Sequence, residues 1–291
     1  MIVLFLSVAT FKANAQTVIE IDPLFEYPVA PEEMESLNEK CNYLVKNFWN
    51  NFDFKKKTAV DQYALNAAFQ VYSTTFQYAS DKDVLQSVDK LIKNLSGNQT
   101  LLMQFCKAAE ENLYGMKADF WADEIYLKFL DAVIKDKKIS ENRKSKYIQQ
   151  ANVLRKSMVG NTAPSFTFTD ASGESKKYFP MSTPTLLIFG DPEDTDWRLA
   201  RLKMDSNFQL DEALNKGKVN ILYIVPGNVK NWQNEVSNYN KYWTTGESSE
   251  AATLYDLRIT PSIFLIDSGG KIVEKHLAAM QAVDMLLQLV K

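Results

Sequence analysis

The fold is decided by residues 185 to 197, which run Thr-Leu-Leu-Ile-Phe-Gly-Asp-Pro-Glu-Asp-Thr-Asp-Trp. Thr185 to Phe189 is a near-continuous apolar run of strand length, which is typical of a strand covered on both faces. A second such run, Val219 to Val225, follows a stretch with helical spacing. The two runs and the stretch between them predict a β-α-β unit.

A hairpin and a last helix complete this half of the chain. Ser262 to Ile266 and Ile272 to Lys275 flank Asp267-Ser268-Gly269-Gly270, a turn-rich sequence that predicts an antiparallel hairpin. Ala278 to Val290 has helical spacing and should cover the sheet. The order β, α, β, α, β, β, α is that of a thioredoxin-like fold, and the rules of crossover handedness allow few other closures.

The preceding half has a different character. From Pro31 to Met158 the apolar residues recur every three or four positions, and alternating β-branched runs are missing. The connections between the periodic segments are short, which predicts antiparallel neighbours in a helical bundle. Six helices are expected, at about residues 34–48, 60–78, 84–95, 98–114, 121–136 and from 140 onward.

The first residues predict an export signal. Ile2 to Phe11 is an apolar stretch too short to span a bilayer, and Ala13-Asn14-Ala15 has the small-x-small pattern of a cleavage site after Ala15. The alternative is an N-terminal strand or a buried tail. The expected organisation is a signal peptide over 1–15, an extended arm over 16–30, a helical bundle domain over 31–159 and a thioredoxin-like α/β domain over 160–291, in the periplasm or another exported compartment.

Composition excludes several classes of function. The 33 basic and 36 acidic residues are spread without long blocks, so the sequence lacks the basic footprint of a nucleic-acid-binding protein. Ile2 to Phe11 is too short for a membrane span, and no other segment reaches the roughly 18 apolar residues that a span needs. Phosphate-loop, HExxH and G-x-S-x-G motifs are absent from the sequence, so neither a kinase nor a hydrolase is indicated.

The C-terminal half resembles exported TlpA-like and peroxiredoxin-like proteins of the thioredoxin fold. Four segments carry the resemblance, in the order and at the spacing of that family. They are Gly160-x-x-Ala163-Pro164-x-Phe166 with Asp170 and Gly173, Leu187-Ile188-Phe189-Gly190-Asp191-Pro192, Thr260-Pro261, and Phe264-Leu265-Ile266-Asp267 with Gly270. The resemblance implies a cis peptide bond between Thr260 and Pro261.

The helical half is similar to an uncharacterised helical domain that precedes thioredoxin-like domains in exported bacterial proteins. The matching residues are Phe25-x-Tyr27-Pro28-x-x-Pro31-Glu32-Glu33-Met34 and Phe48-Trp49-x-x-Phe52-Asp53-Phe54. This similarity implies an architecture and no activity.

The redox cysteines of that family are missing here. In a thioredoxin-like oxidoreductase the attacking thiolate sits at a helix N-terminus, where free N–H groups and the helix dipole favour it. The resemblance places Asp194 and Trp197 at the two cysteine positions, and neither side chain can exchange electrons with a disulfide. The two cysteines of the chain, Cys41 and Cys106, belong to the helical half. Thiol-disulfide oxidoreductase activity is therefore not expected.

The residues that replace the cysteine pair allow more than one interpretation. Asp194 is either a helix cap or part of a cation site with Asp191, Glu193 and Asp196, since hard cations prefer clustered carboxylates. Trp197 is either a contact anchor at the edge of a groove or a side chain packed against the sheet.

The cysteines and the single histidine also have alternatives. Cys41 and Cys106 lie on apolar helix faces, so they are either inert core thiols or, in an oxidising compartment, one structural disulfide. His276 follows the last strand with no nucleophile placed near it by a motif, and it is expected to lie on the surface.

The preferred function is a binding or scaffold module that keeps a groove beside the cis-proline loop, lined by Asp194, Trp197, Thr260 and Pro261. Its partner would be an exported or envelope protein or peptide, and no cofactor is expected. The resemblance implies that such a chain would pair with the domain as an added strand. The alternatives are an enzyme of unknown chemistry at the acidic loop 191–196 and a purely structural envelope protein. A fold alone does not decide between these classes.

Overall fold

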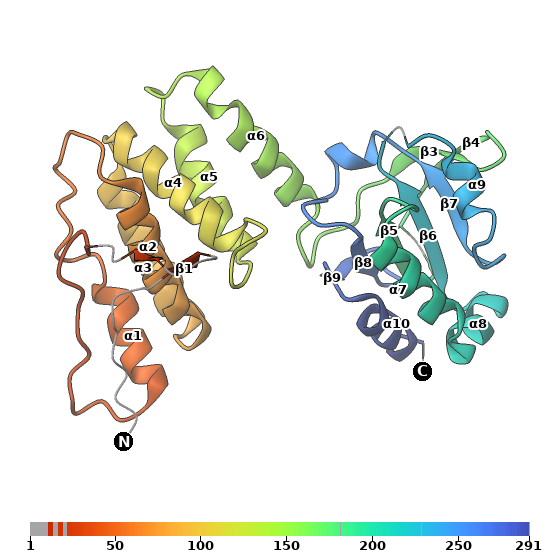
Figure 1. The fold of residues 1–291 in the computed structure, drawn as a ribbon, viewed down its shortest axis with the longest axis horizontal. Coiled ribbons are helices and arrows are strands. Elements are labelled where there is room, and N and C mark those ends of the chain that lie inside the picture. Colours follow the sequence, from red (N-terminus) through yellow and green to blue (C-terminus); the bar gives the residue numbers. More distant parts are fainter. Residues whose placement is uncertain (1–10, 14–16, 20–21, 181, 228, 291) are drawn as a thin grey trace. The chain divides into compact units, whose positions relative to one another are not determined.

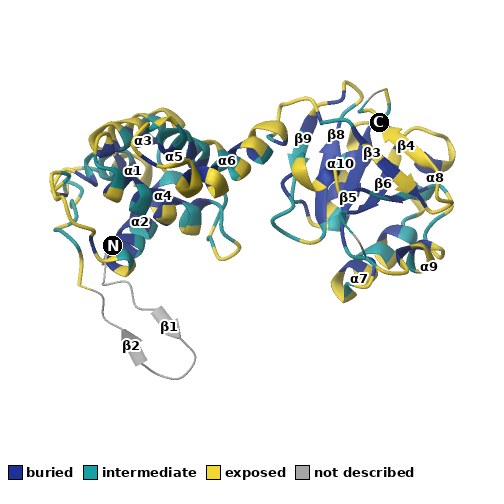
Figure 2. Cartoon of the chain, turned by 90° about the horizontal axis from the view of Figure 1, so that it is seen from above, coloured by how far each residue is buried: buried dark blue, intermediate teal, exposed yellow. Residues whose placement is uncertain are grey.

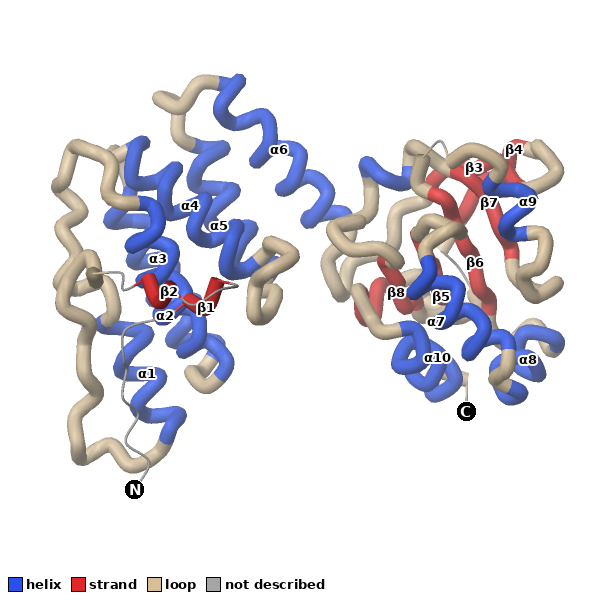
Figure 3. Tube along the Cα trace, viewed as in Figure 1, coloured by secondary structure: helices blue, strands red, loops and turns tan. Residues whose placement is uncertain are grey.

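The computed structural model describes residues 11–13, 17–19, 22–180, 182–227 and 229–290 (Figure 1). The chain divides into two compact units, Met1–Ala151 and Asn152–Lys291, and each is described here by itself. Helices dominate the first unit, whereas a large sheet with helices forms the second (Figure 3). The predicted class, an all-α region followed by a thioredoxin-like α/β domain, is confirmed.

Six α-helices follow one another between Leu37 and Lys156, as the spacing of apolar residues predicted. Two short strands, β1 (Phe11–Ala13) and β2 (Thr17–Ile19), pair antiparallel before them. A 3-10 turn, η1 (Thr75–Gln77), extends the second helix. The helices are α1 (Leu37–Asn47), α2 (Gln62–Thr74), α3 (Asp81–Leu95), α4 (Gln99–Leu113), α5 (Asp123–Lys135) and α6 (Glu141–Lys156).

Local sequence sets the ends of these helices. Before α1, the Ser36 side chain accepts a hydrogen bond from the Glu39 backbone, and the Glu39 side chain accepts one from the Ser36 backbone. Asp61 and Ser80 each accept one backbone N–H bond at the starts of α2 and α3. Gly97 follows α3 with φ +85°, a left-handed conformation that glycine adopts without strain.

Aromatic side chains build the core of the helical unit. The Trp49 ring contacts those of Phe69, Tyr72 and Phe105, with centroids 6.3, 5.4 and 4.9 Å away. Phe25, in the irregular stretch before α1, lies 5.4 Å from Trp49. Such pairs add stabilisation beyond the area that they bury, so this stretch is anchored to the helices by its aromatic ring.

Both cysteines are free and buried, Cys41 on α1 and Cys106 on α4. Burial raises the pKa of each thiol above its usual value. Because the thiolate is the reactive form, a raised pKa makes a thiol less nucleophilic. Of the two states that the sequence left open, the structure supports inert core thiols.

Seven strands form one mixed sheet in the second unit, in the order β4-β3-β7-β6-β5-β8-β9. Strands β5 and β6 are parallel neighbours, which confirms the β-α-β unit, and β8 pairs antiparallel with β9 as the predicted hairpin. The strands are β3 (Phe166–Asp170), β4 (Ser175–Tyr178), β5 (Thr185–Phe189), β6 (Asn220–Val225), β7 (Thr244–Glu247), β8 (Ser262–Ile266) and β9 (Ile272–Lys275).

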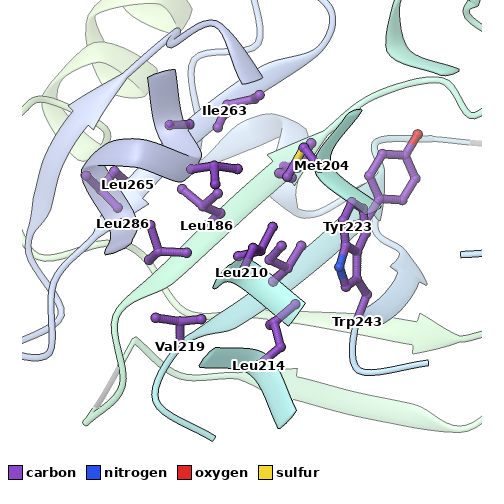
Figure 4. Close-up of a cluster of buried hydrophobic side chains, with 14 of the residues drawn as sticks. Leu186, Met204, Leu210, Leu214, Val219, Tyr223, Trp243, Ile263, Leu265 and Leu286 are labelled. Atoms are coloured by element: carbon purple, nitrogen blue, oxygen red, sulfur yellow. The ribbon is translucent and has the colours of Figure 1, made fainter. Parts of the chain in front are cut away.

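The central strands are buried on both faces (Figure 2). On one face, Leu186 of β5 and Leu265 of β8 share a cluster with Met204 and Leu286, which come from two helices (Figure 4). On the other face, Phe189 of β5 belongs to a second cluster. The helices are α7 (Thr195–Asp205), α8 (Phe208–Asn215), α9 (Trp232–Val236) and α10 (Ala279–Gln288), with a 3-10 turn, η2 (Ala251–Thr253).

Three strands and one helix break were not predicted. Strands β3, β4 and β7 are short and rich in Thr, Ser, Lys and Glu, so their sequences lack the apolar runs of β5 and β6. They are held by pairing with each other and with β6. The single helical stretch expected between β5 and β6 is divided in two, since Asn207 caps a new helix by accepting a hydrogen bond from the Leu210 backbone.

The predicted cleavage point at Ala15 and residues 1–10 lie outside the described residues. Phe11–Ala13 is described and forms β1. Export therefore rests on the sequence alone and stays a prediction. Among the helices of the described part of the chain, none is long and apolar enough to cross a membrane.

Candidate functional site

Asp194 caps α7 at the position that the resemblance assigns to the attacking cysteine. Its Oδ1 accepts a hydrogen bond from the backbone nitrogen of Trp197 at 2.7 Å. The carboxylate thus satisfies one of the N–H groups left free by the first turn, and the helix dipole favours its charge. The cap interpretation is confirmed.

Trp197 does not line a surface groove, and the expectation of a contact anchor is wrong. Its side chain is fully buried, stacked on Tyr223 of β6 with centroids 5.1 Å apart and planes 8° from parallel. Its Nε1 donates a hydrogen bond of 2.8 Å to the hydroxyl of Tyr239. Trp197, the third residue after the cap, lies on the side of α7 that packs against the sheet, so its ring enters the core.

The acidic loop is organised by its own backbone. Asp191 Oδ1 accepts a hydrogen bond from the Glu193 backbone at 2.9 Å, and Asp194 is the helix cap. Across the residues that the structure describes, no three His, Cys, Asp or Glu side chains come together as a possible metal site. The carboxylates of Asp191, Glu193, Asp194 and Asp196 therefore do not converge into the cation site considered from the sequence.

The cis-proline loop lies where the resemblance implies. The peptide bond between Thr260 and Pro261 is cis, which confirms the prediction. An added Cβ on Gly190, the first residue after β5, would lie 3.4 Å from Pro261 Cβ and 3.4 Å from the Tyr223 hydroxyl. The fold thus brings the loop after β5 against the loop before β8, with Thr260 exposed and Pro261 half-buried.

His276 is buried in a charged cluster, which corrects the expectation of a surface position. Its side chain is 4% exposed, and Nε2 lies 3.3 Å from Asp256 Oδ2. Lys275 Nζ donates to the same oxygen at 3.2 Å. The Arg258 guanidinium donates to both carboxylate oxygens, with Nε 3.1 and 2.9 Å from them. Three basic side chains therefore contact one buried carboxylate.

Asp256 is held ionised by these partners. Burial by itself would raise the pKa of this carboxyl, but the hydrogen bonds from His276 and Arg258 and the charges of Arg258 and Lys275 hold the pKa well below its usual range. The Asp256 backbone donates to Ser157 Oγ at 3.1 Å. Asp256 lies five residues before Pro261, and Lys275 and His276 lie at the end of β9. The cluster thus links the loop before Pro261 to the end of β9.

Sequence reasoning missed this cluster. Asp256 and Arg258 look like ordinary loop residues, and Lys275 and His276 look like the polar end of an edge strand. The predicted β8–β9 hairpin could have indicated the cluster. In an antiparallel hairpin the end of β9 lies beside the start of β8, which places Lys275 and His276 near the loop that precedes β8. His276 also has φ +57°, a left-handed conformation that is uncommon for a residue with a side chain.

The mixed sheet and the cis-proline loop define a thioredoxin-like protein, and its thioredoxin-like unit contains no cysteine pair. The model of a family described as a domain of unknown function, DUF5106, matches residues 7–157, more than half of the chain. The protein therefore belongs to the DUF5106 family. No curated protein matches its sequence.

Among solved structures, the chain is similar to a thioredoxin-like protein from Bacteroides caccae, with 19% identity, a TM-score of 0.76 and coverage of 93% of this chain and 100% of that one. A conserved protein of unknown function from Bacteroides fragilis aligns at 25% identity over 45% of this chain and 99% of its own, with a TM-score of 0.42. The peroxidoxin BcpB from Mycobacterium tuberculosis aligns at 14% identity over 46% and 96%, with a TM-score of 0.37. The first similarity shows that the whole two-part architecture has a counterpart of the same fold.

Replacing Trp197 with Ala should destabilise the thioredoxin-like unit by about 3–5 kcal/mol, because a fully buried ring leaves a cavity. The change in the midpoint and free energy of chemical unfolding, followed by circular dichroism, measures it. Leu199→Ala on the exposed side of the same helix is the control, and should stay within about 0.5 kcal/mol of the parent. Equal, small effects of both changes would show that the ring is not a core element.

Replacing Asp256 with Asn should cost about 3–5 kcal/mol at neutral pH, since it removes the carboxylate shared by buried basic side chains. The folded pKa lies below the unfolded value of about 3.9, so this stabilisation is complete above that value and is lost as the pH falls below it. The difference in stability between parent and variant should therefore begin to narrow only below about pH 4 and shrink further as the pH falls toward the much lower folded pKa. The exposed Asp196→Asn change is the control, and a loss that does not depend on acid pH would contradict the assignment.

Proposed function

We propose that this protein is a redox-inactive scaffold of an exported compartment, in which the thioredoxin-like unit is kept for its shape. The observation that carries the proposal is the structural use of the two residues that the resemblance assigns to the cysteine positions. Asp194 caps α7, and the Trp197 ring stacks in the core. A redox centre needs an accessible thiolate at this place, and neither residue supplies one.

The remaining thiols do not substitute for the missing pair. Cys106 is fully buried within α4, and Cys41 is 6% exposed on α1. Burial raises the pKa of both, which lowers the thiolate fraction at neutral pH. Exchange with a protein disulfide requires a thiolate that can reach the disulfide sulfur, so neither cysteine is suited to it.

A scaffold role is favoured over a peptide-binding groove. Binding surfaces usually depend on exposed Trp, Tyr or Arg anchors, and the residue expected to serve as the anchor is in the core. Thr260 is exposed and Pro261 is half-buried, and the buried Trp197 ring cannot serve as a surface anchor for them. Export and an envelope partner are part of the proposal on the strength of the N-terminal sequence.

Purified protein should not accelerate the reduction of insulin by dithiothreitol, measured as the onset and rate of insulin turbidity. The Cys41→Ser/Cys106→Ser variant should behave identically to the parent, and a thioredoxin with an intact cysteine pair serves as the positive control. Acceleration that the double variant loses would show that the helical unit is redox-active. Acceleration that survives it would show chemistry at another group, and either result would overturn the proposal.

A further inference from the structure

The helical unit contains an apolar pocket of about 330 Å³, within the range of small-ligand sites. It lies between η1, the start of α3 and the start of α5. Two rings, Phe76 and Phe120, form part of its wall, with centroids 6.5 Å apart and planes at 72°. The other apolar residues of the wall are Val84, Leu85, Ala122 and Ile125. The charged cluster around Asp256 belongs to the other unit and takes no part in this pocket.

The polar groups of the pocket favour a positive charge. Gln77, Asp81 and Glu124 are its polar residues, so two carboxylates and no basic side chain line it. Asp81 and Glu124 are exposed and form no ion pair within the described part of the chain.

Two lysines near the pocket are paired with other carboxylates. Lys46 pairs with Asp83 of α3 at 2.8 Å, and Lys128 of α5 pairs with Asp89 at 2.8 Å. Lys46 of α1 and Lys128 of α5 are thus each paired with an aspartate of α3 that does not line the pocket. Both carboxylates also stand in the first turn of a helix, where they stabilise the helix dipole, and this role does not require a ligand.

We infer that this pocket binds a small organic cation, with an apolar, single-ring body against Phe76 and Phe120 and an ammonium group toward Asp81 and Glu124. The volume is at the small end of the ligand range, which suits one ring on a short amine chain. The rings and aliphatic side chains would supply contact area, and the carboxylates would select the charge. The inference concerns the helical unit and does not depend on the scaffold proposal.

The test compares three ligands of similar size by isothermal titration calorimetry with the whole mature chain. The probes are 2-phenylethylamine, neutral 2-phenylethanol and anionic 3-phenylpropanoate. The amine should bind about tenfold more tightly than the carboxylate, since one meets attraction and the other repulsion from two exposed charges. Failure of the amine to bind, or equal affinity for amine and carboxylate, would overturn the inference. This comparison uses the unaltered protein and so does not depend on the folding of a variant.

Variants then locate the site. Asp81→Asn and Glu124→Gln should each weaken binding of 2-phenylethylamine about threefold. Asp196→Asn is the matched control, because it is also an exposed carboxylate in the first turn of a helix and lies outside the pocket. It should leave the affinity unchanged. Binding that is insensitive to Asp81→Asn and Glu124→Gln, or that falls equally with Asp196→Asn, would contradict a site at this pocket.

Discussion

The stacking of Trp197 on Tyr223 is the interaction on which the thioredoxin-like unit depends. It joins the first turn of α7 to β6, at the centre of the sheet, with the two rings almost parallel. Asp194 fixes the same turn through the Trp197 backbone, and Tyr239 accepts the indole N–H. A buried indole with its N–H satisfied contributes area without leaving an unpaired polar group. The third residue after the helix cap is thereby part of the core.

Ionic interactions stabilise the loop that leads to Pro261. Asp256 lies in the loop before Pro261 and accepts hydrogen bonds from Arg258 and Lys275, all of them nearly excluded from water. Buried ions of this kind are stable only when their partners are in place, which restrains the loop that carries them. The two loops meet at Gly190 and Pro261. An aromatic stack next to one of these loops and an ionic cluster next to the other thus stabilise this part of the fold.

Much of this could be predicted from the sequence, and the failures have physical causes. The apolar runs of β5, β6 and β8 and the period of the six helices were sufficient, because burial leaves a direct imprint on composition. The Thr260–Pro261 cis bond and the Asp194 cap followed from the resemblance and from capping chemistry. The position of Trp197 did not, since a tryptophan suits both a core and a binding surface. The buried state of His276 depends on residues 18 to 20 positions earlier, so no local pattern could indicate it. Strands β3, β4 and β7 are stabilised by pairing with neighbouring strands, and the pattern of residues within one segment does not indicate its pairing.

The central claim is that position 197 serves the core through its contact with Tyr223. A double-mutant cycle with Trp197→Leu and Tyr223→Leu tests it most directly, using the free energy of chemical unfolding of the parent, both single variants and the double variant. Leucine retains apolar volume at both positions, so the cycle isolates the ring contact. We expect a coupling energy of about 0.5–1.5 kcal/mol, as for other buried aromatic pairs. Additive losses, with a coupling below about 0.3 kcal/mol, would contradict the claim.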